Sequence, residues 1–432
     1  MRRVPLAGLA AILPKTVASC LSSAPALPYN WDEKLRGLIL GIALSRSLVL
    51  QSIAQTCSSR VKTTENMLSA FLAQDRLKLD GPQLACVKAA LKRIRRRRIW
   101  KRDGKVAVVL DSTSHGKPRS RGKKRAMPGK GKVRVQNLRV KETILVPGYQ
   151  EIWIGILLAD RTVLPLTRRL WTECGPDCAS LNLVELAEIS RAIEIVKEVL
   201  ELDVILVADS GFRRKDLLHW LKKVEGIDFV IRLVGNLYVE LDGKQRLLEK
   251  TSLWWPKRTR LQWRDGAKHV LLSDVSARRV GVTTQYGDEV SFNALCLTPT
   301  KEGIDPMFLA TTLTTETVAD LTLIVRLYSW RWGIETFFWK FKQGLNAKSW
   351  RVFSCWKAID RLLTAAHIVY LVLFLIEEMI KRGRTRKLRL MMRRLQDTLR
   401  ERFARPPEMT MGRFLRLIAE DFPSPRRMEA AL

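Results

Sequence analysis

The chain has 432 residues, of which 47% are hydrophobic, and this length and composition predict about two to four folded domains and exclude a largely disordered protein. Its 76 Lys and Arg residues outnumber 43 Asp and Glu residues, which gives a formal charge of +33. Such a charge favours a polyanionic partner, and nucleic acid comes first among the candidates. Two alternative explanations of the charge stay open: binding to an anionic lipid surface, and a soluble basic protein without a polyanionic partner.

Seven scattered cysteines, an odd number, argue against a disulfide framework and fit a reducing compartment. The longest apolar stretch, residues 365–376, is too short to span a bilayer and contains His367. We therefore expect a cytoplasmic protein with no membrane span.

The first region, residues 1–103, is predicted to be a helical DNA-binding region. Residues 32–100 show helical periodicity with few turn signals. A basic run at 92–98 ends this region, and it is equally compatible with a solvated face and with a DNA contact.

Residues 104–235 are predicted to form the first part of a mixed α/β core. Apolar runs predict strands at 106–110, 152–158, 162–170, 204–208 and 227–233, and amphipathic patterns predict helices at 181–200 and 212–224. Residues 115–141 hold eleven Lys or Arg and no acid, with several Gly and Pro residues, and are predicted to be a loop.

The remaining chain divides into three regions. Residues 236–312 are rich in Val, Thr, Trp and turn residues and predict a β-rich insertion. Helical patterns return at 316–345, within a second core segment at 313–350, and again at 356–381. Residues 351–432 are predicted to be a helical, basic C-terminal region.

Two predicted buried strands end in an aspartate, at Asp111 and at Asp209. A carboxylate held at a strand end beside an apolar sheet suits a hard divalent cation. Either aspartate alone is better explained as a turn or helix-capping residue, because Asp commonly begins turns and helices.

The segment from residue 328 to 342 favours a metal site over a turn or capping role for the two aspartates. On a helical wheel Tyr328, Arg331, Glu335 and Lys342 share an arc of about 60°. A neighbouring stripe is apolar and can dock on the sheet, with Leu327, Ile334, Phe338, Phe341 and Leu345. A solvated amphipathic helix is the simpler explanation, but it does not account for one acid surrounded by Tyr, Arg and Lys at the core margin.

Phosphodiester transfer is the chemistry that fits these residues. Two metal ions held by three carboxylates can activate a water or a 3′-hydroxyl and stabilise the leaving oxygen. Asp111 is the best candidate to bridge both ions, with Asp209 and Glu335 each holding one. Arg331 and Lys342 can clamp phosphates, and Tyr328 can donate a hydrogen bond to a phosphate oxygen.

The spacing Y-(2)-R-(3)-E-(6)-K at Tyr328, Arg331, Glu335 and Lys342 resembles the signature of a bacterial insertion-sequence DDE transposase family, the IS-four type. Asp111-Ser112-Thr113 and Asp209-Ser210-Gly211-Phe212 resemble the two aspartate motifs of that family, in the same order. The resemblance covers roughly residues 105–345.

This resemblance implies an RNase H-like catalytic core with a β insertion between the second aspartate and the glutamate. It implies cut-and-paste transposition of an insertion sequence, by hydrolysis and strand transfer at terminal inverted repeats, through a DNA hairpin intermediate. It further implies two Mg²⁺ ions, replaceable by Mn²⁺, and a homodimer that acts on its own DNA ends and on target DNA, associated with the nucleoid.

Two features of this chain bear on that implied mechanism. The family often has Arg after the second aspartate, where this chain has Ser210, so Arg213 or Arg214 would have to take over any role of that Arg. A hairpin needs an aromatic residue to stack a flipped base, and Trp254, Trp255 and Trp263 are candidates among basic residues. Packing in the core is the more probable role for each of them.

Two other functions remain open on the sequence. A nuclease with the same metal site would cut DNA without joining it. A DNA-binding protein without catalysis would not need three acids in one site.

Overall fold

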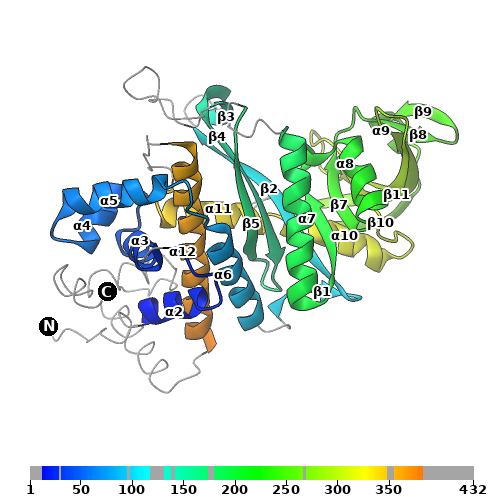
Figure 1. Cartoon of the computed structure of the whole chain (residues 1–432). Helices are drawn as coiled ribbons and strands as arrows, with labels where there is room; N and C mark the ends of the chain where they lie inside the picture. The colour runs from blue at the N-terminus through cyan, green and yellow to red at the C-terminus, as the bar shows by residue number, and fades with distance from the viewer. Residues whose placement is uncertain are drawn as a thin grey trace, which may run out of the picture.

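The structure is a computed structural model that describes residues 12–28, 31–94, 98–116, 131–137, 142–173, 180–265, 269–347 and 355–382. It has a mixed α/β fold in which helices pack around one large mixed sheet (Figure 1). The predicted basic tail after residue 382 lies outside these ranges.

The N-terminal part is helical. Its helices are α2 (Ile12–Leu21), α3 (Trp31–Ser45), α4 (Leu50–Cys57), α5 (Val61–Ala73) and α6 (Asp80–Arg93). Apolar side chains at helical spacing on α3 are buried, including Leu35, Leu38, Ile39 and Ile42, so the amphipathic pattern in the sequence becomes the core of this part.

The sheet begins with β1 (Lys101–Arg102), β2 (Lys105–Gly116), β3 (Gly131–Asn137), β4 (Glu142–Leu157), β5 (Val163–Trp171), β6 (Asp203–Ala208) and β7 (Asp228–Leu233). Its central strands lie in the order β5, β4, β2, β6, β7. The first three are antiparallel neighbours, whereas β6 is parallel to β2 and β7 is parallel to β6. Because β2 and β6 are covered on both faces, residues 106–110 and 204–208 are all buried.

The region after β7 extends the same sheet. It contains β8 (Tyr238–Leu241), β9 (Lys244–Leu247), α9 (Leu248–Ser252), β10 (Lys257–Asp265), β11 (His269–Thr283), β12 (Glu289–Pro299) and β13 (Met307–Thr311). β13 is antiparallel to β7, and β12, β11 and β10 follow as antiparallel neighbours. Residues 236–312 are therefore β-rich, as their composition predicts.

The later helices lie against the central strands. α7 (Leu181–Leu200) lies in front of the sheet and α11 (Gly333–Gly344) passes behind it in Figure 1. Short helical segments η4 (Ser210–Phe212), α8 (Lys215–His219) and η5 (Trp220–Val224) follow β6. α10 (Val318–Trp330) begins at a capping box in which Thr317 and Asp320 exchange side-chain and backbone hydrogen bonds.

The last described helix, α12 (Trp356–Arg382), corrects one expectation. The stretch 356–379 is long and apolar enough to cross a membrane, although residues 365–376 alone appear too short. In its most apolar window 89% of the residues are buried inside the protein, because α12 packs against α2, α3, α5, α6 and β5 (Figure 1). It is the central helix of the N-terminal helical part.

The strand and helix predictions agree with most of these elements, but several differ. β2 continues to Gly116 instead of ending at Leu110, and the predicted helix 212–224 is divided into η4, α8 and η5. Residues 131–137 of the predicted loop form β3, because β4 continues beyond the predicted hairpin and offers it a pairing edge. The rest of that loop, apart from residues 115 and 116 at the end of β2, lies outside the described ranges. The predicted helix 316–345 is divided into α10 and α11 around Arg331 and Trp332.

Candidate active site

The two aspartates lie side by side on neighbouring parallel strands, at the edge of the sheet where β6 ends. Asp209 directly follows β6, whereas Asp111 is not at a strand end as predicted, because β2 continues to Gly116. The register pairs Leu110 with Ala208, so Asp111 and Asp209 are each the next residue on adjacent strands. The backbone N–H of Ser112 donates to Asp111 Oδ1 and that of Ser210 donates to Asp209 Oδ1, both at 2.7 Å. Asp209 also caps η4, as expected for Asp at a helix start.

Arg331, between α10 and α11, brings the third acid to this edge. Its Nη1 lies 3.0 Å from Asp111 Oδ2, and its Nη2 lies 3.8 Å from Asp209 Oδ2 and 3.6 Å from Glu335 Oε1. The Arg331 side chain is only 3% exposed, whereas Asp209 and Glu335 are 37% and 38% exposed. The three acids, distant in the sequence, thus surround one buried guanidinium.

Tyr328 and Lys342 complete the predicted set. The Tyr328 hydroxyl donates to Asp209 Oδ1 at 3.2 Å, and the ring lies beside the Arg331 guanidinium at 5.5 Å. The Lys342 ammonium donates to the hydroxyl of Thr113, two residues beyond Asp111 on β2. All six residues singled out for the site by the sequence therefore lie at one edge of the sheet.

Burial and mutual repulsion shape the protonation of the acids. Burial raises the pKa of Asp111 to about 6, although Arg331 and the N–H of Ser112 act in the opposite direction. Burial also raises the pKa of Glu335 to about 7, and Asp111 and Asp209 add to this shift while Arg331 opposes it. One guanidinium therefore offsets only part of the cost of gathering three carboxylates.

The donor set agrees in kind with a hard divalent cation, because all three candidate ligands are carboxylates. Among the described residues, no group of three His, Cys, Asp or Glu side chains has the spacing of a metal site. The Arg331 guanidinium takes the central position here. A cation bound between the acids would have to share that position with Arg331 or move it.

The tryptophans that the sequence offers for base stacking lie in different surroundings. Trp254 is 85% exposed at the end of α9, while Trp255 and Trp263 are each 5% exposed. The indole N–H of Trp263 donates to Ser273 Oγ at 2.9 Å. Trp263 nevertheless lines a cavity of about 720 Å³, together with Trp330, Trp332, Arg161 and Arg326. Sequence reasoning missed Trp330 and Trp332, although they flank Arg331.

Neither basic residue proposed to replace the Arg missing at Ser210 reaches an acid of the site among the contacts described. Arg213 donates back to the carbonyl of Ser210 at 2.6 Å, and Arg214 pairs with Glu185 of α7.

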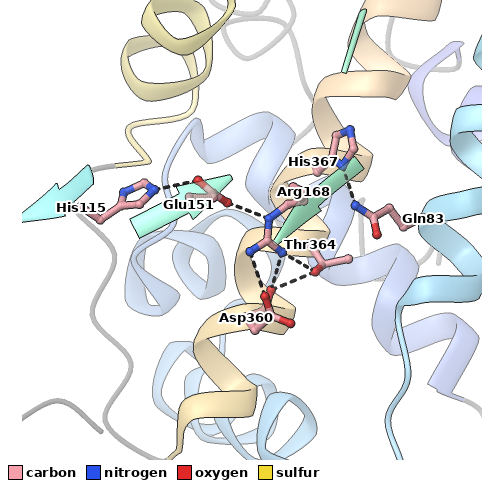
Figure 2. A network of polar contacts seen from close by, with 7 residues as sticks. All are labelled: Gln83, His115, Glu151, Arg168, Asp360, Thr364 and His367. Atoms are coloured by element: carbon pink, nitrogen blue, oxygen red, sulfur yellow. Dashed lines mark hydrogen bonds and ion pairs between the residues drawn. The ribbon is translucent and has the colours of Figure 1, made fainter. Parts of the chain in front are cut away.

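Figure 2 shows a largely buried polar network that was not anticipated from the sequence. The registers of β2, β4 and β5 place it on the same face of the sheet as Asp111. Figure 2 shows Arg168 of β5 between Glu151 of β4 and Asp360 of α12, at 2.7 and 2.8 Å. Glu151 also binds His115 at the end of β2, at 2.7 Å. Burial alone would raise the pKa of Glu151, but Arg168 and His115 outweigh it and lower this pKa to about 2.

This network ties the strand of Asp111 to α12 through charged groups. The signal in the sequence is a pair of charges, Glu151 and Arg168, within or beside apolar stretches of a predicted hairpin. Charged groups at such positions are buried only when they are paired.

Comparison with known proteins agrees with this geometry. Residues 186–371 match the family model for the transposase DDE domain. The matched stretch contains Asp209, Arg331 and Glu335 and runs into α12, while Asp111 precedes it. No curated protein matches the chain. The match covers less than half of the chain and indicates a transposase DDE domain in that part of it.

Proposed function

We propose that this protein is a DDE transposase that moves an insertion sequence by cut-and-paste transposition, through metal-dependent hydrolysis and strand transfer at terminal inverted repeats. The observation that carries the proposal is the convergence of Asp111, Asp209 and Glu335 on Arg331, at 3.0 to 3.8 Å, at one sheet edge. The domain match supports the same reading independently of this geometry.

The strand order supports an RNase H-like core. The chain runs through three antiparallel strands, β2, β4 and β5, and then adds β6 and β7 parallel to β2 on its other side. In this proposal residues 236–312 are the insertion between the second aspartate and the glutamate.

In the proposed reaction Asp111, Asp209 and Glu335 hold two Mg²⁺ ions, which Mn²⁺ can replace. The ions would supply Lewis-acid activation of the attacking oxygen and stabilisation of the leaving oxygen. Lys342 and Tyr328 bind the phosphates beside the scissile bond. Arg331 balances the carboxylates and, as a planar donor, would contact the phosphate only after leaving its buried position among the acids.

Excision through a DNA hairpin is the finer part of the proposal. A hairpin requires a strained strand with an unstacked base, which needs an aromatic surface. Of the three candidates, Trp263 has the support of the cavity it lines with Trp330 and Trp332, next to the helix of Glu335. Trp254 remains a candidate through its exposed ring, whereas Trp255 has neither feature.

The proposed assembly is a homodimer that brings the two ends of the element together on target DNA, in the cytoplasm and at the nucleoid. The formal charge of +33 supports close association with DNA.

The test uses the full chain, Mg²⁺ and a DNA duplex that carries the inverted repeat flanking the gene. We expect the wild type to cleave at the repeat end and to join the cleaved end to target DNA. Asp111→Asn, Asp209→Asn and Glu335→Gln should each retain DNA binding and lose cleavage by at least 100-fold, because each removes a charged ligand while keeping the size of the side chain.

Three outcomes separate the alternatives. Cleavage by any one of the three variants at the wild-type rate would rule out the assigned site. Cleavage without joining in the wild type would favour a nuclease. DNA binding that needs none of the acids, with no cleavage in Mg²⁺ or Mn²⁺, would favour a DNA-binding protein without catalysis.

A further inference from the structure

Helix α11 presents a large aromatic side chain to solvent beside the candidate active site. Trp339 is 65% exposed, although most of the apolar residues around it on this helix are buried, including Ile334, Phe337, Phe338 and Phe341. Its exposed neighbours at helical spacing are Thr336 and Gln343. An indole left in water on an otherwise well-packed helix is typical of a binding surface.

The position of Trp339 relates it directly to the acids. It lies one helical turn beyond Glu335 and about 40° around the helix from it. Lys342, which binds Thr113 beside Asp111, follows three residues later on the same side. The indole therefore borders the place where the three carboxylates meet.

A second tryptophan, Trp332 at the start of α11, points in nearly the same direction from the helix axis as Trp339. Trp332 precedes Trp339 by seven residues, which is two turns, roughly 10 Å along the helix and within about 20° of the same direction. Trp332 borders the cavity of about 720 Å³, and Thr336, which also lines that cavity, lies between the two rings. Glu335 is thus bracketed along α11 by an aromatic residue on each side.

We propose that Trp339 stacks on a base of the DNA strand that enters the candidate active site, on the opposite side of Glu335 from the cavity at Trp332. The proposal rests on the proposed function, since it requires DNA at these acids. Stacking on an indole holds a nucleotide in place without reading its sequence, because every base has an aromatic face.

The charge of the surface favours a nucleic acid over a protein partner. Residues 333–344 contain one acid, Glu335, and two lysines, Lys340 and Lys342. An aromatic ring flanked by ammonium groups is the usual combination for single-stranded nucleic acid, because the lysines follow the phosphates while the ring holds a base. A contact with a second copy of the chain is the competing explanation for the exposed ring.

The experiment compares Trp339→Ala, Trp339→Phe and the control Tyr286→Ala. Tyr286 is also an exposed aromatic residue, at 79%, but lies in the turn between β11 and β12. Affinity is measured without metal on a repeat-end duplex with a single-stranded overhang, and cleavage is measured with Mg²⁺. Stacking contributes about 1–3 kcal/mol per base, so Trp339→Ala should weaken affinity by roughly 5- to 150-fold.

Trp339→Phe should retain most of the DNA affinity that Trp339→Ala loses. Tyr286→Ala should bind and cleave DNA as the wild type does. The second arm places 2-aminopurine, whose fluorescence falls on stacking, at successive positions around the cleavage point. One position should be quenched by the wild type and by Trp339→Phe but not by Trp339→Ala. Removing the base at that position should cost the wild type as much affinity as Trp339→Ala, with no further loss when both changes are combined.

Two results would overturn the inference. One is wild-type affinity and quenching in Trp339→Ala. The other is a change in oligomeric state in that variant with unchanged DNA affinity, since the ring would then contact protein. If the wild type bound and quenched as described but never cleaved, the proposed catalytic function would fail while the stacking role stood.

Discussion

Arg331 is the single side chain on which the arrangement of the acids depends. It is 3% exposed and lies within 4 Å of Asp111, Asp209 and Glu335. Its pKa is raised because, although burial lowers it, the three carboxylates more than compensate. A cation that is already part of the protein therefore holds the site together, and a divalent ion would take over part of that electrostatic role.

Replacing Arg331 by Met should destabilise the protein and increase its response to metal. Asp111 would remain largely buried without its partner. Removing one partner of a buried ion pair lowers the free energy of unfolding by about 3–5 kcal/mol. Addition of Mg²⁺ should then raise the melting temperature more in Arg331→Met than in the wild type, because the ion replaces the lost positive charge. Thermal unfolding with and without Mg²⁺ measures both effects.

Arg278→Met is the matched control, because Arg278 pairs with Asp242 at the surface, where both side chains are largely exposed. It should change stability little and should leave the metal response as in the wild type. Equal metal responses in all three proteins would contradict the assigned role of Arg331.

At this scale the sequence selects candidate residues but not their contacts. An aspartate after each of two apolar runs and a helical spacing of four polar residues select Asp111, Asp209, Tyr328, Arg331, Glu335 and Lys342 as candidates, and the structure brings these six together. That Arg331 would bind all three acids depends on the strand register and on how α10 and α11 pack on the sheet, neither of which is encoded in local spacing.

The break between α10 and α11, at Arg331 and Trp332, lies where the chain brings Glu335 to the sheet. Gly333, the first residue of α11, lies so close to the neighbouring chain that an added Cβ would be 2.4 Å from the carbonyl oxygen of Arg161 and 3.0 Å from Val163 Cγ2. The absence of a side chain there allows α11 to approach the β4–β5 hairpin closely. In the sequence the same glycine appears only as a weak point of the helix.

Gly333→Ala should therefore reduce cleavage, although alanine is the better helix former. The backbone oxygen of Arg161 cannot move aside cheaply, so α11 would shift and displace Glu335, at a cost of about 1–3 kcal/mol in stability. Gly344→Ala, at the other end of the same helix, meets no atom within 4 Å and should gain about 0.5–1 kcal/mol. Equal behaviour of the two variants in cleavage and unfolding assays would argue against close packing as the reason for Gly333.

The sequence predicts most helices and strands because their apolar periodicity reflects burial, as for α7, whose predicted and observed limits coincide. It does not predict β3, whose basic residues carry little strand signal and which forms because β4 offers an edge. It also does not predict the pairing of β13 with β7, which joins the later strands to the central sheet through contacts distant in sequence.

Across the whole molecule, α12 joins the N-terminal helices to the sheet. Its His367 accepts from the Gln83 amide of α6 at 2.6 Å and packs against Trp153 of β4, while Tyr370 packs against Phe337 of α11. Trp153 is itself the register partner of Asp111. One aromatic cluster thus connects the helical part, the sheet and the helix of Glu335.

The buried state of His367 should make the stability of the whole protein depend on pH. Burial lowers its pKa to about 3, with the positive charge of Arg168 adding to the shift, whereas the unfolded chain has an ordinary value of 6.5. As the pH falls, the unfolded state therefore binds the proton first. The contribution of neutral His367 to the free energy of unfolding is full above pH 6.5 and is lost as the pH falls toward 3.

Relative to His367→Gln, the wild type should lose roughly 2 kcal/mol more stability between pH 7 and pH 5. Denaturant unfolding at both pH values measures the difference. The ionisable neighbours Glu151, Arg168 and Arg191 are present in both proteins, so their titration cancels in the comparison. Parallel stability curves for the two proteins would show that His367 does not titrate in this range.

The place of α12 in the chain has a consequence for synthesis. Helices α2, α3, α5 and α6 leave the ribosome long before α12, yet their apolar faces pack against it. While some 260 intervening residues are being translated, the parts of those faces that α12 covers stay exposed, and exposed apolar surface on an incomplete chain favours aggregation. A chain that stops before residue 356 should therefore have less stable N-terminal helices as well as lacking its end.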